Sequence, residues 1–183
     1  MCYLLCKEEK VIINNKEFII RFPKMEDVYS FVSFFNSLVQ EEAQITKNEK
    51  VTIEEVKDWL KSIIKKIESN KLHCICVFYG NKLVANLEVN KLGYRASHVA
   101  VLAIAVDKEF RNQGLAKFLL NKAIHISKND KDIKVLTLDV FETNTIAINL
   151  YKKMGFREVA RLPKRIYYHG KLIDIITMDY YFD

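Results

Sequence analysis

A basic, glycine-containing loop is the first stretch of the sequence whose residue types could do chemistry. Its six residues, Arg111 to Ala116, lie between an apolar, β-branched run and a segment with helical periodicity. In a strand–loop–helix arrangement, the unpaired N–H groups at the start of the helix can hold a phosphate. Gly114 would let the backbone approach such a group closely, and Arg111 would add positive charge. The stretch therefore predicts either a phosphate site or an ordinary turn between a strand and a helix.

A second cluster of polar residues lies between residues 138 and 156. It contains an acidic residue in a strand-like run, Asp139, and an asparagine at the expected start of a helix, Asn144. Tyr151 follows Asn144 by about two helical turns, so the two side chains lie on nearly the same helical face. A carboxylate can accept a proton, and a phenol with an ordinary pKa of about 10 can donate one at neutral pH. These are the residue types of general acid–base chemistry.

The elements that must position both clusters follow from hydrophobic periodicity and turn residues. Strands are expected at residues 11–13, 17–22, 72–79, 82–89, 99–106, 133–140, 156–162 and 171–182. Helices are expected at residues 25–40, 52–69, 115–128 and 144–154. Thr52 and Glu55 form a capping box, and residues 163–170 are expected to be a basic, aromatic loop. The order predicts a single domain over residues 1–183, of the α/β class (α+β type) with a mixed sheet.

Composition and charge argue against several classes of protein. No apolar run approaches the length of about 18 residues that a membrane helix needs. The apolar run at the N-terminus is too short for a signal peptide. Together these features predict a cytoplasmic protein without a membrane partner. The formal charge of +6 is spread along the chain and accompanies no nucleic-acid-binding signature, so no nucleic acid partner is expected. Cys2, Cys6, Cys74 and Cys76 lack metal-ligand spacing, which predicts no metal site.

Taken together, the two clusters resemble the GNAT superfamily of N-acetyltransferases. Residues 111–116 match its R/Q-x-x-G-x-G/A acetyl-CoA signature, and residues 138–156 match its L-E/D-V-x-x-x-N-x-x-A-x-x-L-Y-x-x-x-G-F pattern. The resemblance covers roughly residues 17–181 and implies a mixed, mostly antiparallel sheet of six or seven strands flanked by about four helices.

The resemblance also implies acetyl-CoA as co-substrate and assigns residues to it. The backbone of the loop would hold the pyrophosphate, which involves Arg111, Asn112, Gln113, Gly114, Leu115 and Ala116. Ile104, Ala105 and Val106 would pair with the pantetheine arm as with an added strand, and one of their N–H groups would polarise the thioester carbonyl. Asn144, Ala147 and Tyr151 would contribute the remaining contacts to the cofactor.

For catalysis, the resemblance makes Tyr151 the acid that protonates the departing thiolate. Asp139 occupies the acidic position of the L-E/D-V motif, where some members of the family use a glutamate as base. Glu88, His98 and a chain of waters are the alternatives for the base. No cysteine is convincingly placed at the cleft, so direct transfer in a ternary complex is expected rather than an acetyl-enzyme.

The acceptor is then expected to be a primary amine of a small molecule or of a protein or peptide. Its pocket would be formed by the variable segments, residues 38–52, 90–98 and 163–171. The competing hypothesis is a catalytically inactive acyl-CoA-binding module with a sensor or structural role. The sequence leaves open whether the protein is a monomer or a homodimer.

Overall fold

The computed structural model describes residues 8–182 and divides the chain into two compact units. The first unit covers the chain up to Asn90 together with Ala103–Leu119, and the second covers Lys91–Leu102 together with the chain from Leu120. The unit boundaries therefore fall inside two strands and one helix, and each of these elements contributes residues to both units.

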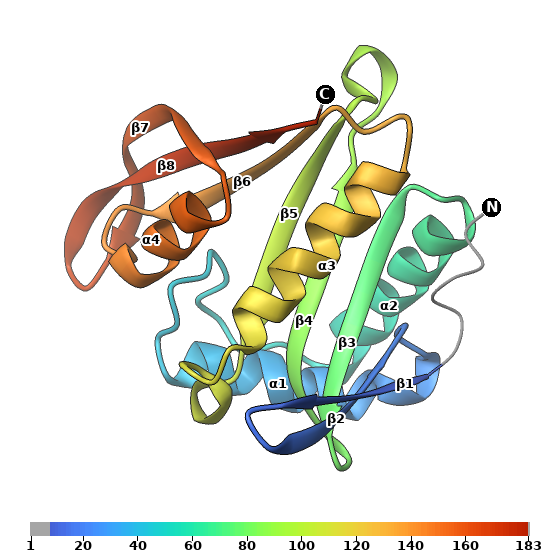
Figure 1. Ribbon diagram of the computed structural model, residues 1–183. Coiled ribbons are helices and arrows are strands. Elements are labelled where there is room, and N and C mark those ends of the chain that lie inside the picture. Colours follow the sequence, from blue (N-terminus) through green and yellow to red (C-terminus); the bar gives the residue numbers. More distant parts are fainter. Residues whose placement is uncertain (1–7, 183) are drawn as a thin grey trace. The chain divides into compact units, whose positions relative to one another are not determined.

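The elements confirm the predicted class, a mixed α+β fold with a mostly antiparallel sheet (Figure 1). Residues 8–182 contain eight strands, the number that hydrophobic periodicity predicts, so the six or seven implied by the resemblance was too few. The strands are β1 (Glu9–Ile13), β2 (Lys16–Arg21), β3 (Leu72–Tyr79), β4 (Lys82–Lys91), β5 (Val99–Val106), β6 (Val135–Phe141), β7 (Arg157–Tyr168) and β8 (Lys171–Tyr181). The α-helices are α1 (Val28–Gln40), α2 (Ile53–Glu68), α3 (Leu115–Asn129) and α4 (Thr145–Lys153). None of the helices within residues 8–182 is long and apolar enough to cross a membrane.

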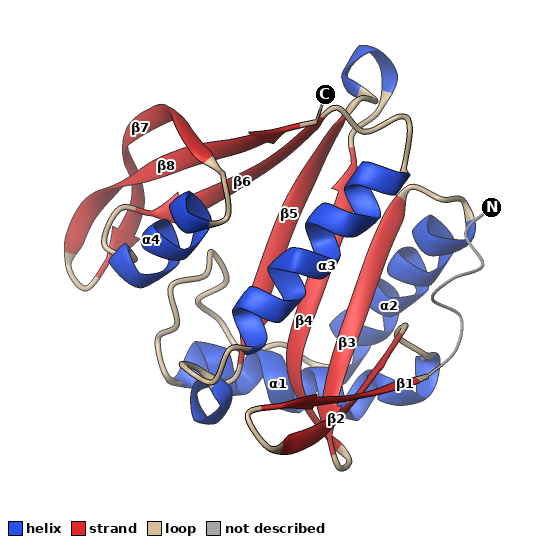
Figure 2. Ribbon diagram, viewed as in Figure 1, coloured by secondary structure: helices blue, strands red, loops and turns tan. Residues whose placement is uncertain are grey.

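In the first unit, β1 to β4 pair antiparallel in chain order (Figure 2). The turn between β1 and β2 is formed by Asn14 and Asn15, both with positive φ, as asparagine tolerates. Helices α1 and α2 pack together and cover this part of the sheet with a shared core. Its buried side chains are Val28, Phe31, Phe34, Leu38, Val56, Leu60, Cys76, Phe78 and Leu83. Cys74 and Cys76 are buried free thiols, while Cys2 and Cys6 lie outside the described residues.

The start of α2 confirms the predicted capping box. The Thr52 hydroxyl accepts a hydrogen bond from the Glu55 N–H at 3.2 Å, and the Glu55 carboxylate accepts one from the Thr52 N–H at 2.7 Å. The bond from the Thr52 N–H, together with one that the Thr52 hydroxyl donates to the Glu55 carboxylate at 3.1 Å, lowers the pKa of Glu55, because both favour its charged form. The helix therefore begins where two of its otherwise unpaired N–H groups find partners in the local sequence.

In the second unit, the first part of β5 pairs parallel with β6, from Val99–Val135 to Val101–Thr137. Strand β6 then pairs antiparallel with β8, and β8 with β7. Helix α4 ends at Lys153, and Gly155, two residues beyond, has a φ of +98°, the left-handed conformation that favours glycine after a helix. A Cβ at this position would also lie 3.1 Å from the ring of Tyr180.

The expected loop at residues 163–170 was wrong for most of its length. Strand β7 continues through it to Tyr168, and only His169 and Gly170 form the turn into β8. Pro163 is tolerated because β7 is an edge strand, where a missing N–H breaks no ladder on the outer side. The register of β7 against β8 shifts between Leu162 and Ile166, and Lys164 has a φ of 56°. Pro163 therefore lies in an irregular part of the strand, where the pairing with β8 is interrupted.

The capping box gives a first test of the fold. Replacing Thr52 by Ala removes the side-chain partner of the Glu55 N–H, and we expect a loss of about 1 kcal/mol in the free energy of unfolding. Urea denaturation followed by circular dichroism measures this change. Lys57→Ala, an exposed substitution inside α2, is the matched control and should change the free energy by less than about 0.5 kcal/mol. Equal losses in both variants would contradict the capping role.

Candidate functional site

The predicted phosphate loop lies in the first unit, between β5 and α3. A short 3-10 helix, Lys108–Phe110, follows β5, and the loop then turns with positive φ at Asn112 (58°) and at Gly114 (89°). The first hydrogen bond of α3 runs from the Phe118 N–H to the Gly114 carbonyl at 2.9 Å. The N–H groups of the first turn of α3 thus have no acceptor within the helix, as an anion site requires. The special conformation of Gly114 was expected, but that of Asn112 was not.

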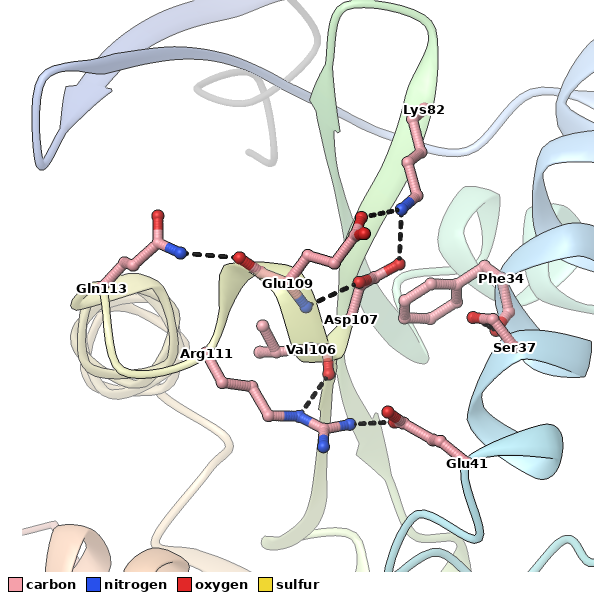
Figure 3. Close-up of polar contacts among 9 residues, drawn as sticks. All are labelled: Phe34, Ser37, Glu41, Lys82, Val106, Asp107, Glu109, Arg111 and Gln113. Atoms are coloured by element: carbon pink, nitrogen blue, oxygen red, sulfur yellow. Dashed lines mark hydrogen bonds and ion pairs between the residues drawn. The ribbon is translucent and has the colours of Figure 1, made fainter.

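Asp107 anchors the loop to the end of β5 (Figure 3). Asp107 is 4% exposed, and its carboxylate accepts a hydrogen bond from the Glu109 N–H at 3.0 Å and forms an ion pair with Lys82 at 3.0 Å. Lys82 also contacts the Glu109 carboxylate at 2.7 Å, and these two acids raise the pKa of Lys82. Sequence reasoning missed this network, although an aspartate directly after an apolar strand is a typical helix cap.

Arg111 is held by the protein itself. Its Nε donates to the Val106 carbonyl at 2.9 Å, and its terminal nitrogen forms a hydrogen-bonded ion pair with Glu41, just beyond the end of α1 (Figure 3). Arg111 therefore ties the loop to both β5 and α1. This is a structural contact in addition to the expected contribution of charge.

Gln113 links the loop to the hairpin of β1 and β2. Its side-chain oxygen accepts from Lys16 Nζ at 2.8 Å, and its side-chain nitrogen donates to the Glu109 carbonyl at 2.6 Å. The same Lys16 ammonium lies 5.2 Å from the centre of the Phe110 ring. The loop is thus fixed by side chains on both sides of Asn112, while the side chain of Asn112 itself is exposed.

The predicted thioester-binding residues lie at the end of β5. The paired residues of β5 and β6 end at Val101, before this part of the strand. Ala103, Ile104 and Ala105 form one wall of a cavity of about 350 Å³ that lies within the first unit. The other walls come from α1, the segment after it, α2 and β4. The segment 38–52, expected to vary with the acceptor, contributes Leu38, Ile45, Thr46, Lys47 and Val51 to these walls.

Glu88 of β4 lines this cavity and is the most perturbed carboxylate near β5. Burial raises its pKa, and the hydrogen bond from Asn86 Nδ2 at 2.9 Å opposes this shift only in part. Asn86 is itself oriented by Cys74, whose thiol donates to the Asn86 side-chain oxygen at 3.3 Å. Hydrogen bonding to Cys76 and burial raise the pKa of Cys74, so it keeps its proton. Asn86 and Cys74 therefore position Glu88, which was only an alternative in the sequence.

The other predicted catalytic residues lie in the second unit. Asp139 is exposed on β6 and accepts a hydrogen bond from the Thr177 hydroxyl at 2.7 Å. Asn144 caps α4, because its side-chain oxygen accepts from the Ala147 N–H at 3.2 Å. Burial raises the pKa of Tyr151 to about 12, and its ring centre lies 5.8 Å from that of Phe156. His98, the third candidate base, is exposed.

With this geometry in view, comparison with known proteins shows the family. The chain belongs to the acetyltransferase (GNAT) family, whose model matches residues 34–156. The L-amino acid N-acetyltransferase AaaT of Escherichia coli is 34% identical over 84 residues, which are 46% of this chain and 52% of that protein. An N-alpha-acetyltransferase of Sulfurisphaera tokodaii is 40% identical over 68 residues, 37% of this chain and 40% of that protein. The chain thus spans about half or less of the length of these relatives.

Solved structures show the same fold. An acetyltransferase of the GNAT family from Streptococcus pneumoniae has a TM-score of 0.81 and 25% identity, covering 90% of this chain and 99% of its own. The acetyltransferase yncA of Salmonella typhimurium, solved with its cofactor acetyl-CoA, has a TM-score of 0.77 and 17% identity, covering 91% and 94% of the two chains.

The loop conformation can be tested at Gly114. A Cβ there would be 3.7 Å from the Ile13 side chain, an ordinary contact, so the cost of Gly114→Ala lies in its φ of +89°. We expect the free energy of unfolding to fall by about 1–2 kcal/mol, measured by urea denaturation. Gly93→Ala is the control, because Gly93 has a negative φ and no atom within 4 Å of the added Cβ. If the control lost as much stability, the explanation by backbone conformation would be wrong.

Proposed function

We propose that this protein is an acetyl-CoA-dependent N-acyltransferase that acetylates a primary amine by direct transfer. Membership of the acetyltransferase (GNAT) family supports this proposal, as does the acetyl-CoA bound by the Salmonella typhimurium protein of the same fold. The observation that carries it is the position of Glu88, a carboxylate with a raised pKa in a cavity whose wall is the predicted thioester-binding strand.

Acetyl-CoA supplies the acetyl group as a thioester. We assign its pyrophosphate to the N–H groups of residues 111–116, where the positive φ of Asn112 and Gly114 and the start of α3 favour an anion. The end of β5, Ile104–Val106, is assigned to the pantetheine arm and the thioester carbonyl. On the second unit, Asn144, Ala147 and Tyr151 keep the cofactor contacts expected from the resemblance.

The chemistry requires one proton to leave the amine and one to reach the departing thiolate. An ammonium acceptor must be deprotonated before its nitrogen attacks the thioester carbon and the C–S bond breaks. A carboxylate with a raised pKa is the better base, because its affinity for a proton lies closer to that of the amine. We therefore assign this proton to Glu88 in preference to the exposed Asp139. Tyr151, with a pKa of about 12, holds a proton at neutral pH that it can give to the thiolate.

Two substitutions separate the candidate bases. Glu88→Gln keeps the shape and an acceptor for Asn86 but removes the base, so kcat should fall by about 100-fold or more. The wild-type kcat should rise with pH through the Glu88 pKa, which lies above the ordinary 4.5, because only the ionised form accepts a proton. Asp139→Asn is the matched control and should change kcat by less than about threefold. A large loss in Asp139→Asn with little loss in Glu88→Gln would return the role to Asp139.

Cofactor binding and the acid can be tested together. Calorimetric titration of the folded protein with acetyl-CoA should show saturable binding, and its absence would overturn the proposal. Tyr151→Phe should lower kcat by about tenfold or more while leaving the Kd for acetyl-CoA almost unchanged, because only the proton donor is lost. An unchanged kcat would remove Tyr151 from the acid role. A protein that binds acetyl-CoA but releases no thiol with any amine would instead be the inactive binding module.

A further inference from the structure

We propose that the cavity beside Glu88 binds the apolar side chain of the acceptor, so that the acceptor is an α-amine next to a branched or aromatic hydrophobic group. This rests on the proposed function and adds to it the chemical class of the substrate. Two sources share this chemistry, a free amino acid and the first residue of a peptide.

The lining of the cavity is the first observation. Large apolar side chains from three elements face it and stay only partly covered: Phe35 of α1, Ile45 and Val51 of the connecting segment, and Trp59 of α2. The rings of Phe35 and Trp59 meet edge to face, with centres 5.3 Å apart and planes at 83°. Their neighbours on the same helices, such as Phe31 and Leu60, are fully buried at 0% exposure. An apolar group in the cavity would cover the surface that the fold itself leaves exposed.

The charges around the cavity are the second observation. At the wall formed by β4, Glu88 and Asn86 are the polar side chains, and Glu88 is suited to an ammonium group. Lys47 and Glu55 also line the cavity, but they form an ion pair of 4.0 Å with half-exposed side chains, 47% and 55%. An amine can therefore meet a carboxylate while the rest of the acceptor meets hydrocarbon. A second charge on the acceptor side chain would be desolvated among Phe35, Val51 and Trp59.

The volume of the cavity limits the size of the acceptor. At about 350 Å³ it stands near the lower end of the range of about 300–1,000 Å³ that is typical of small-molecule pockets. One hydrophobic side chain with its amino group fits within this volume.

The single tryptophan of the chain provides a test that needs no turnover. Trp59 lines the cavity, so an apolar amine that enters it should shift or quench the Trp59 fluorescence. We expect saturable changes with L-leucine or the dipeptide Leu-Ala, and at least tenfold weaker binding of L-aspartate and Asp-Ala. The two arms, free amino acid and dipeptide, show which source is preferred, and an apolar preference in either arm supports the inference. No response to either leucine compound, or an equal response to the aspartate compounds, would overturn it.

Two loop variants locate the binding. Ile45→Asp places a charge in the wall of the cavity and should weaken leucine binding by at least tenfold. Asn48→Asp places the same charge three residues away, at an exposed position that does not line the cavity, and should leave binding unchanged. If both variants bind like the wild type, the inference is wrong.

The same compounds, assayed for thiol release from acetyl-CoA, separate this inference from the proposed function. Transfer to aspartate with equal or higher kcat/KM would overturn the inference and leave the function standing. Saturable leucine binding at Trp59 without any transfer would leave the inference standing and overturn the function. Transfer with at least tenfold higher kcat/KM for the leucine compounds supports both.

Discussion

Asp107 stands where β5 ends, and its carboxylate is nearly removed from water at 4% exposure. A buried charge of this kind is stable only when it is paired and hydrogen bonded, and Asp107 meets both conditions through Lys82 and the Glu109 N–H. Its backbone N–H also donates to the Val84 carbonyl of β4 at 2.9 Å. One residue thus fixes where the strand stops, where the 3-10 helix starts and how both lie on the neighbouring strand. The direction of the predicted phosphate loop depends on all three.

The loop itself is held by a second set of contacts, none of which requires a ligand. Arg111 reaches Val106 and Glu41, and Gln113 bridges Lys16 and Glu109. Such pre-organisation reduces the conformational entropy that is lost on binding, because the N–H groups of the loop are already oriented toward the anion position before an anion binds. The ion pair joins the partly exposed Arg111 to the largely buried Glu41, and it fixes the geometry of the loop against the end of α1.

Local signals in the sequence predicted the elements well, because their causes are local. The capping box of Thr52 and the glycine at position 155 act within a few residues, and both elements begin or end as expected. The course of residues 163–168 was missed because an edge strand tolerates Pro163, and edge position is decided by pairing far along the chain. From the sequence, Glu88 was only an alternative base, because its surroundings also depend on residues far along the chain. Its raised pKa comes from burial by other elements, which the hydrogen bond from Asn86 offsets only in part, and no spacing rule reveals that burial.

The partly covered wall of the cavity has a consequence for the folding equilibrium. Side chains such as Trp59 and Val51 are only partly buried in the free protein, and the ionised Glu88 is held in surroundings that favour its neutral form. Any compound that fills the cavity binds the native state and not the unfolded chain, so mass action adds its binding free energy to that of folding. The resistance of this protein to heat and proteolysis thereby rises with the concentration of any compound that fills the cavity.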